Sequence, residues 1–303
     1  MKTGIWVEKY RPRTIADVIF QDTRQQRMFE TFIERGDIPH LFLSGVQGTG
    51  KTTISKALVR DLGVDSADVL RINCSDEKID AMRHKVVAFA MTLPMGKFKV
   101  VQLEEIDMLS LDAQGLLRGL IEDTSSNCRF IATCNYENKV IAPLKSRFQQ
   151  FFFAAPDKEK IAERVVTILE SEGVEYDAGD LVTYIDVGYP DIRKTIQLLQ
   201  GNIADGRLMG PGSNTGAGTG WKFELLDALT ARDLKRARRV VCTQASKEEH
   251  EDVYRFLYDN VHRLPVSDHE QAIVTIADHL YRHGIVADTE ICLAACFISL
   301  SKL

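Results

Sequence analysis

The stretch His40–Thr52, HLFLSGVQGTGKT, decides the fold, because a short apolar run enters a glycine-rich loop there. The part from Gly45 to Thr52 matches the pattern GxxxxGK(S/T), and apolar periodicity over 51–62 predicts a helix directly after it. Glycines permit positive φ, so successive backbone N–H groups can line a concave anion nest at the N-terminus of that helix. We therefore predict a phosphate-binding loop, the P-loop, formed by Gly45, Val46, Gln47, Gly48, Thr49, Gly50, Lys51, Thr52 and Thr53.

Two side chains of the P-loop have expected chemical roles. Lys51 is expected to reach the β- and γ-phosphates of a nucleotide, and the Thr52 hydroxyl to hold Mg²⁺. The pattern arises by chance in about 1% of chains of this length. The strand–loop–helix context lowers that figure further, so the sequence predicts nucleotide binding.

Short apolar runs alternate with helical patterns along the first half of the chain. Strands are predicted at 40–44, 69–73, 99–103, 129–133 and 150–153, with helices at 51–62, 77–92 and 113–123. This alternation predicts an α/β fold with a five-stranded, mainly parallel sheet covered on both faces. From 157 to 200 the pattern becomes helical.

A glycine-rich stretch divides the chain. Seven of the 20 glycines lie in 201–220, which predicts a flexible linker because such a composition buries little apolar surface. Only helices are predicted after it, at 223–229, 234–243, 248–261, 269–281 and 289–300. We therefore expect four parts: a nucleotide-binding α/β module (1–153), a small helical subdomain (154–203), a linker (204–220) and an all-α domain (221–303).

Two carboxylates follow the predicted strand 99–103. Glu104 is expected among the metal ligands, usually through water, and Glu105 is expected to polarise the attacking water as general base. Asp is the residue expected at position 104. Glu is one methylene longer, and because Mg²⁺ demands tight octahedral geometry, the metal is then held differently or less firmly.

Three further polar residues are candidates on weaker grounds. Asn135, after strand 129–133, is either a turn residue or a ligand of the attacking water or the γ-phosphate. Arg147 is either an ordinary surface arginine or an arginine finger for a neighbouring subunit's site. Arg193, near a helix start, can reach the γ-phosphate from the lid side.

The amino-acid composition argues against some classes of function. The chain carries 38 Lys+Arg and 43 Asp+Glu, a net charge of −5, which argues against a chain-wide basic coat for nucleic acid. Residues 1–153 carry 21 basic and 19 acidic residues, however, so a local basic surface remains possible there. Six cysteines in no metal-binding spacing, no membrane-spanning run and no signal peptide predict a soluble, cytoplasmic protein.

Taken together, these motifs resemble the AAA+ clamp-loader ATPases over nearly all of residues 5–200. Trp6–Pro12, WVEKYRP, resembles the opening WxEKYRP, and 72–76, INCSD, resembles the LNASD segment. Ser146–Phe148 resembles the SRC box, with Phe where Cys is usual. Details at Lys78–Asp80 and Pro190–Lys194 look more like the loader of T-even-type bacteriophages than like replication factor C.

The resemblance implies an AAA+ P-loop module with a RecA-like sheet, a helical lid and a C-terminal oligomerising collar. It implies ATP and Mg²⁺ as ligands, with Tyr10, Arg11 and Pro12 packed around the adenine. It places Arg147 in trans, acting on a neighbour's nucleotide. The residues that it implies to act in cis are Lys51, Thr52, Glu104, Glu105, Asn135 and Arg193.

The resemblance also implies partners: four copies of the chain with one different subunit, a sliding clamp and primer–template DNA. The candidate DNA contacts are Lys78, Arg83 and Lys85, and a solvated basic face is an equally good interpretation of them. The candidates for switching and coupling are Asn73, which would restrain the catalytic Glu, and the pair Gln114 and Arg118, which could hydrogen-bond. An exposed subset of the apolar residues over 88–95 could dock on the clamp.

Two alternatives remain open. The chain could be a nucleotide-binding assembly scaffold of the loader with weak turnover, an alternative suggested by Glu104. It could also be another AAA+ DNA motor or helicase loader, which would be indifferent to the clamp.

Overall fold

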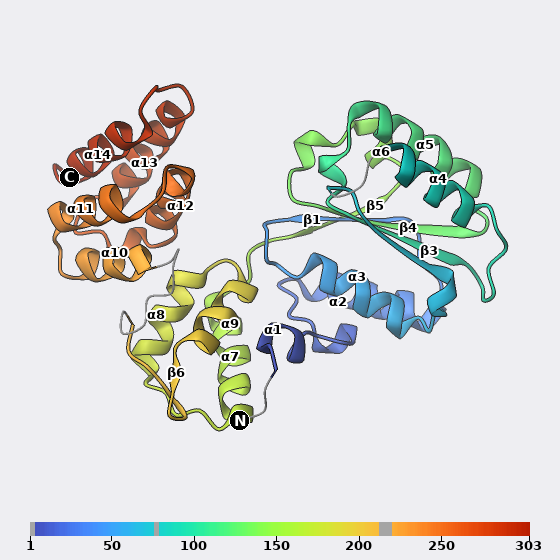
Figure 1. Cartoon of the computed structure of the whole chain (residues 1–303), viewed down its shortest axis with the longest axis horizontal. Coiled ribbons are helices and arrows are strands. Elements are labelled where there is room, and N and C mark those ends of the chain that lie inside the picture. Colours follow the sequence, from blue (N-terminus) through green and yellow to red (C-terminus); the bar gives the residue numbers. More distant parts are fainter. Residues whose placement is uncertain (1–3, 76–78, 212–219) are drawn as a thin grey trace. The chain divides into compact units, whose positions relative to one another are not determined.

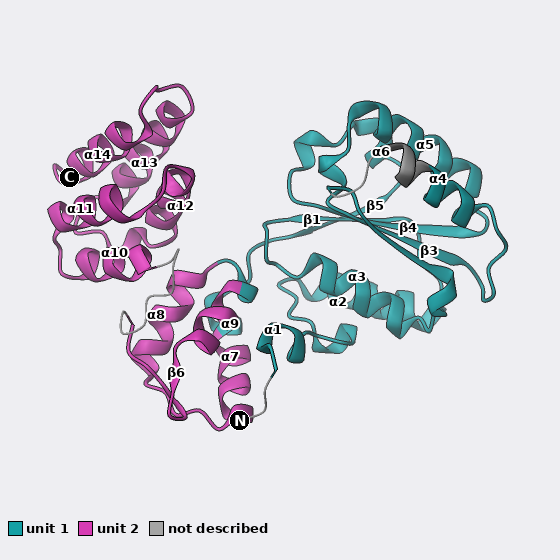
Figure 2. Cartoon of the chain, viewed as in Figure 1, with its two compact units in different colours: residues 1–161, 190–193 teal, residues 162–189, 194–303 magenta. Residues whose placement is uncertain are grey.

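The computed structural model describes residues 4–75, 79–211 and 220–303, and of 79–83 the backbone alone. It divides into two compact units, one formed by residues 1–161 with 190–193 and the other by residues 162–189 with 194–303 (Figure 2). The first unit contains the P-loop and the predicted sheet.

The first unit is built on a five-stranded parallel sheet of order β2-β3-β4-β1-β5. The strands are β1 (Leu41–Gly45), β2 (Val69–Asn73), β3 (Lys99–Glu104), β4 (Cys128–Cys134) and β5 (Gln149–Phe153). All five strands lie where the apolar runs predict them, which confirms the α/β fold. Because every pairing is parallel, the carboxyl ends of all strands lie at one edge of the sheet.

Helices cover both faces of this sheet (Figure 1). One face carries α2 (Thr23–Arg35) and α3 (Lys51–Asp61), and the other carries α4 (Ile79–Ala90), α5 (Leu111–Thr124) and α6 (Ala142–Lys145). Strand β1 shows why two layers form: Phe42 is buried in one apolar cluster, while its neighbours Leu41 and Leu43 are buried in the other. Strand side chains alternate between faces, so a wholly apolar strand requires cover on both sides.

The second unit is almost entirely helical. Its N-terminal part contains most of α7 (Lys158–Glu172), then α8 (Ala178–Gly188) and α9 (Ile192–Gly201), whose first residues belong to the first unit. Five helices follow, as predicted: α10 (Gly220–Thr230), α11 (Leu234–Gln244), α12 (His250–Asp259), α13 (His269–His283) and α14 (Thr289–Leu300). No helix in the described part of the chain is both long and apolar enough to cross a bilayer.

The prediction of a flexible linker is wrong for its first part. Strands β6 (Ile203–Ala204) and β7 (Arg207–Leu208) form a small antiparallel hairpin, and Leu208 is buried. The Tyr184 hydroxyl of α8 donates to the Met209 carbonyl oxygen (3.0 Å), which fastens the segment to the helices. Two-residue strands are too short to show alternation in sequence, so glycine content dominated the prediction. Residues 212–219 lie outside the described residues.

Candidate nucleotide-binding site

The P-loop joins β1 to α3 and contains three glycines with positive φ, namely Gly45 (+143°), Gly48 (+80°) and Gly50 (+88°). Only glycine adopts such angles without strain. At Gly45 a Cβ would also lie 2.9 Å from the Phe153 carbonyl carbon and closer still to its oxygen. The glycines therefore give the loop its curvature and let it pack against the end of β5.

Lys51 opens α3 and folds back into the loop. Its Nζ donates to the carbonyl oxygens of Gly45 (2.9 Å) and Val46 (2.7 Å), and the residue is buried. Burial lowers the pKa of Lys51 to about 8, although nearby negative groups raise it in part, among them Asp107, Asp191 and Glu105. The ammonium group is thus still charged at neutral pH and is held where the P-loop pattern requires it.

Both predicted carboxylates lie at the carboxyl edge of the sheet. The Glu104 carboxylate pairs with Lys56 of α3 at 3.3 Å. Lys56 follows Thr52 by four residues on the same helix, so the two lie on one face of α3 and Glu104 faces that helix near the P-loop. Glu105 has φ +57°, a left-handed conformation that costs a non-glycine residue about 1–2 kcal/mol. Its N–H donates to Thr133 Oγ1 of β4 (3.3 Å), which helps to hold that conformation.

The Asp107 carboxylate, to which the sequence assigned no role, holds Asn135 in place. The buried Asp107 side chain accepts hydrogen bonds from the backbone N–H groups of Asn135 and Tyr136, both at 3.3 Å. It thereby ties the loop after β4 to the loop after β3, which contains Glu105. In the sequence, Asp107 looks like an ordinary turn residue two positions after Glu105. Its burial in the structure is what distinguishes it from one.

The two predicted arginines lie on different elements. Arg147, between α6 and β5, forms an ion pair with Glu122 of α5, with Nε at 2.5 Å from Oε1. Arg193 is exposed at the start of α9, and its backbone N–H donates to Asp191 Oδ1 (2.8 Å). Asp191 in turn lies against Gly48 of the P-loop. The structure therefore brings the start of α9, but not Arg147, into contact with the P-loop of the same chain.

A small cavity of about 100 Å³ adjoins the P-loop at Thr49. It is lined by Ile19, Gln21, Asp22, Gln25, Phe152, Phe153, Ala154, Pro156 and Ile192 as well. Phe152 and Phe153 belong to the predicted strand 150–153 and Ile192 to the motif at 190–194, but no sequence pattern assigned the lining residues to the nucleotide base. The predicted adenine contacts Tyr10, Arg11 and Pro12 do not line it, and Pro12 lines a separate cavity of about 560 Å³ beside α3.

The predicted coupling residues have structural partners of their own. Asn73 pairs in register with Glu104, and its Oδ1 accepts from the N–H (3.2 Å) and hydroxyl (3.0 Å) of Ser75. The fully buried Gln114 donates to the carbonyls of Leu109 and Lys139 and accepts from the Ile141 N–H (2.8 Å). These bonds link α5 to the loops that follow β3 and β4.

The hydrogen bond predicted between Gln114 and Arg118 is not formed in the described structure. The Gln114 amide points into the core and is used by backbone groups, whereas Arg118 is exposed. Of the predicted DNA contacts, Lys78 and the side chain of Arg83 lie outside the described residues, and Lys85 is exposed on α4. Those three roles stay predictions.

Comparisons with known proteins agree with this fold. Residues 41–155 match the family described as "ATPase family associated with various cellular activities (AAA)". Over 210 residues the chain is 45% identical to the replication factor C small subunit of Archaeoglobus fulgidus, covering 68% of this chain and 66% of that one. Over 209 residues it is 42% identical to that of Saccharolobus solfataricus, covering 67% and 63%. The chain thus spans slightly less than two thirds of these relatives.

Solved structures extend the likeness in fold alone. Two structures of Thermotoga maritima RuvB mutants match with TM-scores of 0.57 and 0.55, at 17% and 16% identity, covering 97% and 96% of this chain and 91% of each of theirs. The chain therefore contains an AAA domain with the AAA+ P-loop α/β fold, and it is homologous to the small subunits of archaeal replication factor C.

Proposed function

We propose that this chain is the ATPase subunit of a sliding-clamp loader. It binds and hydrolyses ATP at the interfaces between subunits, opens the DNA polymerase processivity clamp and loads it on primer–template DNA. The observation that carries the proposal is the convergence of Lys51, Glu105 and Asn135 at one edge of an AAA+ sheet, in a chain similar to replication factor C small subunits.

In cis, the P-loop amides and Lys51 would hold the phosphates. The site fits Mg²⁺ as well, because Thr52 and Glu104 offer the oxygen ligands that this cation prefers. Bound Mg²⁺ supplies positive charge that neutralises the phosphates. Glu105 would take a proton from the attacking water, and Asn135 would orient that water. The cavity beside Thr49 would receive the base, together with or in place of contacts from Tyr10, Arg11 and Pro12.

In trans, Arg147 would complete the site of a neighbouring copy. Its present partner is Glu122, and both side chains are nearly half exposed. Exposed ion pairs of this kind contribute at most about 1 kcal/mol. The Arg147 guanidinium can therefore leave Glu122 for a phosphate at little cost.

The clamp would dock beside the end of α4. Met91, Leu93 and Met95 are 65%, 81% and 79% exposed, an unusual concentration of apolar surface in a short segment. Met91 also lines an apolar groove of about 390 Å³ between α4 and α5, together with Val87 and Leu116 among others. Lys85 would face the DNA backbone; the other two predicted contacts, Lys78 and the side chain of Arg83, lie outside the described residues.

We further propose, from the motif details at Lys78–Asp80 and Pro190–Lys194, a loader of the T-even bacteriophage type. In such a loader four copies of this chain join one different subunit, in the cytoplasm of the host cell. The helices α10–α14 would form the collar that holds the copies together.

The test is the ATPase rate of the assembled loader with and without clamp and primed DNA. Clamp and DNA together should stimulate hydrolysis, and Glu105→Gln should lower the rate by about 10²–10⁴-fold while leaving ATP binding intact, because only proton transfer is lost. No stimulation, or no loss in Glu105→Gln, would contradict the proposal.

One observation favours a second candidate, an assembly scaffold with weak turnover. The ion pair between Glu104 and Lys56 already neutralises the carboxylate expected to help hold the metal. Lys56→Gln separates the candidates: faster hydrolysis in that variant would show that the pair restrains a real ATPase, whereas slow hydrolysis under every condition would support the scaffold. A DNA motor of another kind would respond to DNA and ignore the clamp.

A further inference from the structure

A carboxylate outside the predicted catalytic set lies against the P-loop. A Cβ built on Gly48 would lie 2.7 Å from Asp191 Cβ and closer still to the Asp191 carboxyl group. Gly48 stands in the middle of the loop, so the missing side chain is what lets a carboxylate approach the loop backbone. Residues 190–193 belong to the same compact unit as the P-loop (Figure 2).

The same carboxylate organises the start of α9. Asp191 Oδ1 accepts a hydrogen bond from the Arg193 N–H at 2.8 Å, the bond by which Asp residues commonly stabilise the first turn of a helix. One side chain therefore connects the middle of the P-loop with the backbone of Arg193, the residue expected to reach the γ-phosphate.

The negative charge of Asp191 affects Lys51 in the P-loop. Asp191 is one of the negative groups that act on the buried Lys51 ammonium. A nucleotide would bring several negative charges onto the same loop backbone and the same lysine. Phosphates bound there and the nearby Asp191 carboxylate would repel each other, because the site is partly buried and poorly screened.

We propose that Asp191 is a positioning residue that sets the nucleotide affinity of the P-loop. Its carboxylate lies beside Gly48 and acts on the charge of Lys51, and entering phosphates displace it. Because Asp191 also holds the Arg193 N–H, its displacement carries the occupancy of the loop to the start of α9. This inference rests on the proposed nucleotide binding and adds to it a residue that opposes binding until phosphate arrives.

The experiment removes the charge and keeps the helix cap. Asn caps helices as well as Asp does, so Asp191→Asn should leave the Tm of the nucleotide-free chain unchanged. By titration calorimetry at low salt, ADP and a non-hydrolysable ATP analogue should each bind about three- to tenfold more tightly to Asp191→Asn than to the wild type. The gain should shrink at high salt, because it is electrostatic.

A matched control uses another helix cap. Asp177 accepts from the N–H groups of Gly179 and Asp180 at the start of α8, and Asp177→Asn should leave nucleotide affinity unchanged. If Asp191→Asn binds nucleotide no more tightly than the wild type, Asp191 is only a cap and the proposal is overturned.

Lys51→Ala, measured alongside, keeps the two proposals apart. Lost binding in Lys51→Ala with an unaltered Asp191→Asn would remove the role of Asp191 and leave the nucleotide site standing. Full binding in Lys51→Ala would remove the proposed nucleotide site itself.

Discussion

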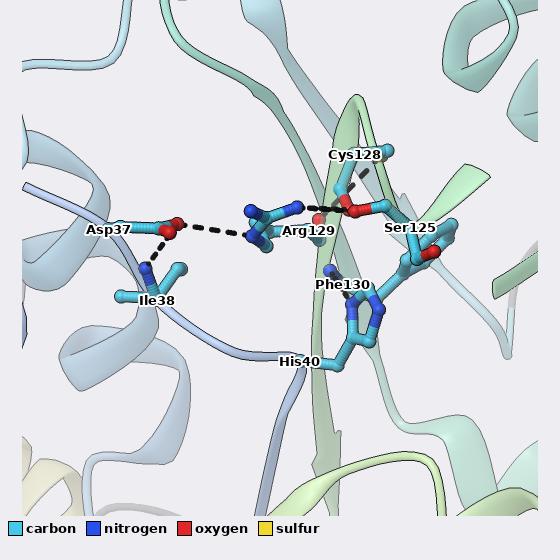
Figure 3. Close-up of polar contacts among 7 residues, drawn as sticks. All are labelled: Asp37, Ile38, His40, Ser125, Cys128, Arg129 and Phe130. Atoms are coloured by element: carbon cyan, nitrogen blue, oxygen red, sulfur yellow. Dashed lines mark hydrogen bonds and ion pairs between the residues drawn. The ribbon is translucent and has the colours of Figure 1, made fainter. Parts of the chain in front are cut away.

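Polar residues lie at both ends of the strands of the central sheet, the amino edge and the carboxyl edge, but their interactions differ between the two. At the amino edge, where β1 and β4 begin, the polar groups bind one another (Figure 3). Arg129 donates to Asp37 Oδ1 (3.2 Å) and to the Ser125 carbonyl (2.6 Å), and His40 Nδ1 accepts from the Phe130 N–H (3.1 Å). The Arg129 guanidinium also lies over the Phe98 ring, 5.2 Å from its centroid.

At the carboxyl edge, most of the polar groups are held by loop backbone, the ion pair of Glu104 with Lys56 excepted. Three glycines of the P-loop and Glu105 adopt positive φ, Lys51 bonds to two loop carbonyls, and Asp107 holds backbone N–H groups of the next loop. A polar network whose members bind one another stabilises the fold, whereas polar groups held by loop backbone keep the capacity to bind a ligand. Substitutions at the two edges should therefore have different effects on stability and on nucleotide affinity.

The largest effect is expected from Lys51→Ala at the carboxyl edge. Nucleotide affinity should fall by at least about 100-fold, since charge-assisted hydrogen bonds to phosphate are lost. Calorimetric titration with ADP measures it, and the urea midpoint should move less than in Arg129→Ala, because the hydrogen bonds of Lys51 in the described structure go to two loop carbonyls. A large loss of stability with unchanged nucleotide affinity would mean that Lys51 stabilises the fold and does not bind the nucleotide.

The amino edge should show the opposite behaviour. Arg129→Ala should lower the free energy of unfolding by about 2 kcal/mol, because hydrogen bonds and the contact with Phe98 are lost together. Nucleotide affinity should stay unchanged. Asp37→Asn is the milder control, expected to cost less than about 1 kcal/mol, since Asp37 is exposed and an amide oxygen can still accept from the Ile38 N–H.

The amino edge should also respond to pH through His40. Burial, aided by the positive charge of Arg129, lowers the pKa of His40 to about 4. The unfolded chain therefore takes up a proton first, so this contribution to stability is complete above about pH 6.5 and is lost as the pH falls toward 4. His40→Asn keeps an acceptor and cannot titrate there. Urea unfolding between pH 7 and 5 should show a shallower loss of stability in this variant than in the wild type, and equal slopes would contradict the prediction.

The smallest effect is expected at the exposed pair of Arg147 and Glu122. Glu122→Gln should change the free energy of unfolding by less than about 1 kcal/mol, because solvent already screens the pair. Urea unfolding in low and high salt checks this. A cost well above that value would mean that Arg147 is a structural residue, which would argue against its proposed action in trans.

Local patterns in the sequence determined a large part of this protein. The run from His40 to Thr52 predicts a strand, a P-loop and a helix, and each is formed, because apolar periodicity and glycine backbone freedom act over a few residues. The alternation of strands and helices likewise predicted the parallel sheet. Parallel pairing brings the strand ends to one edge of the sheet, so the sequence alone groups Glu104, Glu105 and Asn135.

How these groups are held depends on contacts between residues that lie from 25 to more than 100 positions apart in the sequence. Examples are the contact of Asp191 with Gly48, the hydrogen bonds of Asp107 to the loop after β4 and those of the buried Gln114. No local periodicity records such pairs, since each depends on burial and on which loops meet. The hairpin at 203–208 was missed for the same reason: besides the pairing of its two short strands, Tyr184 of α8 and the backbone of Glu175 hold this segment.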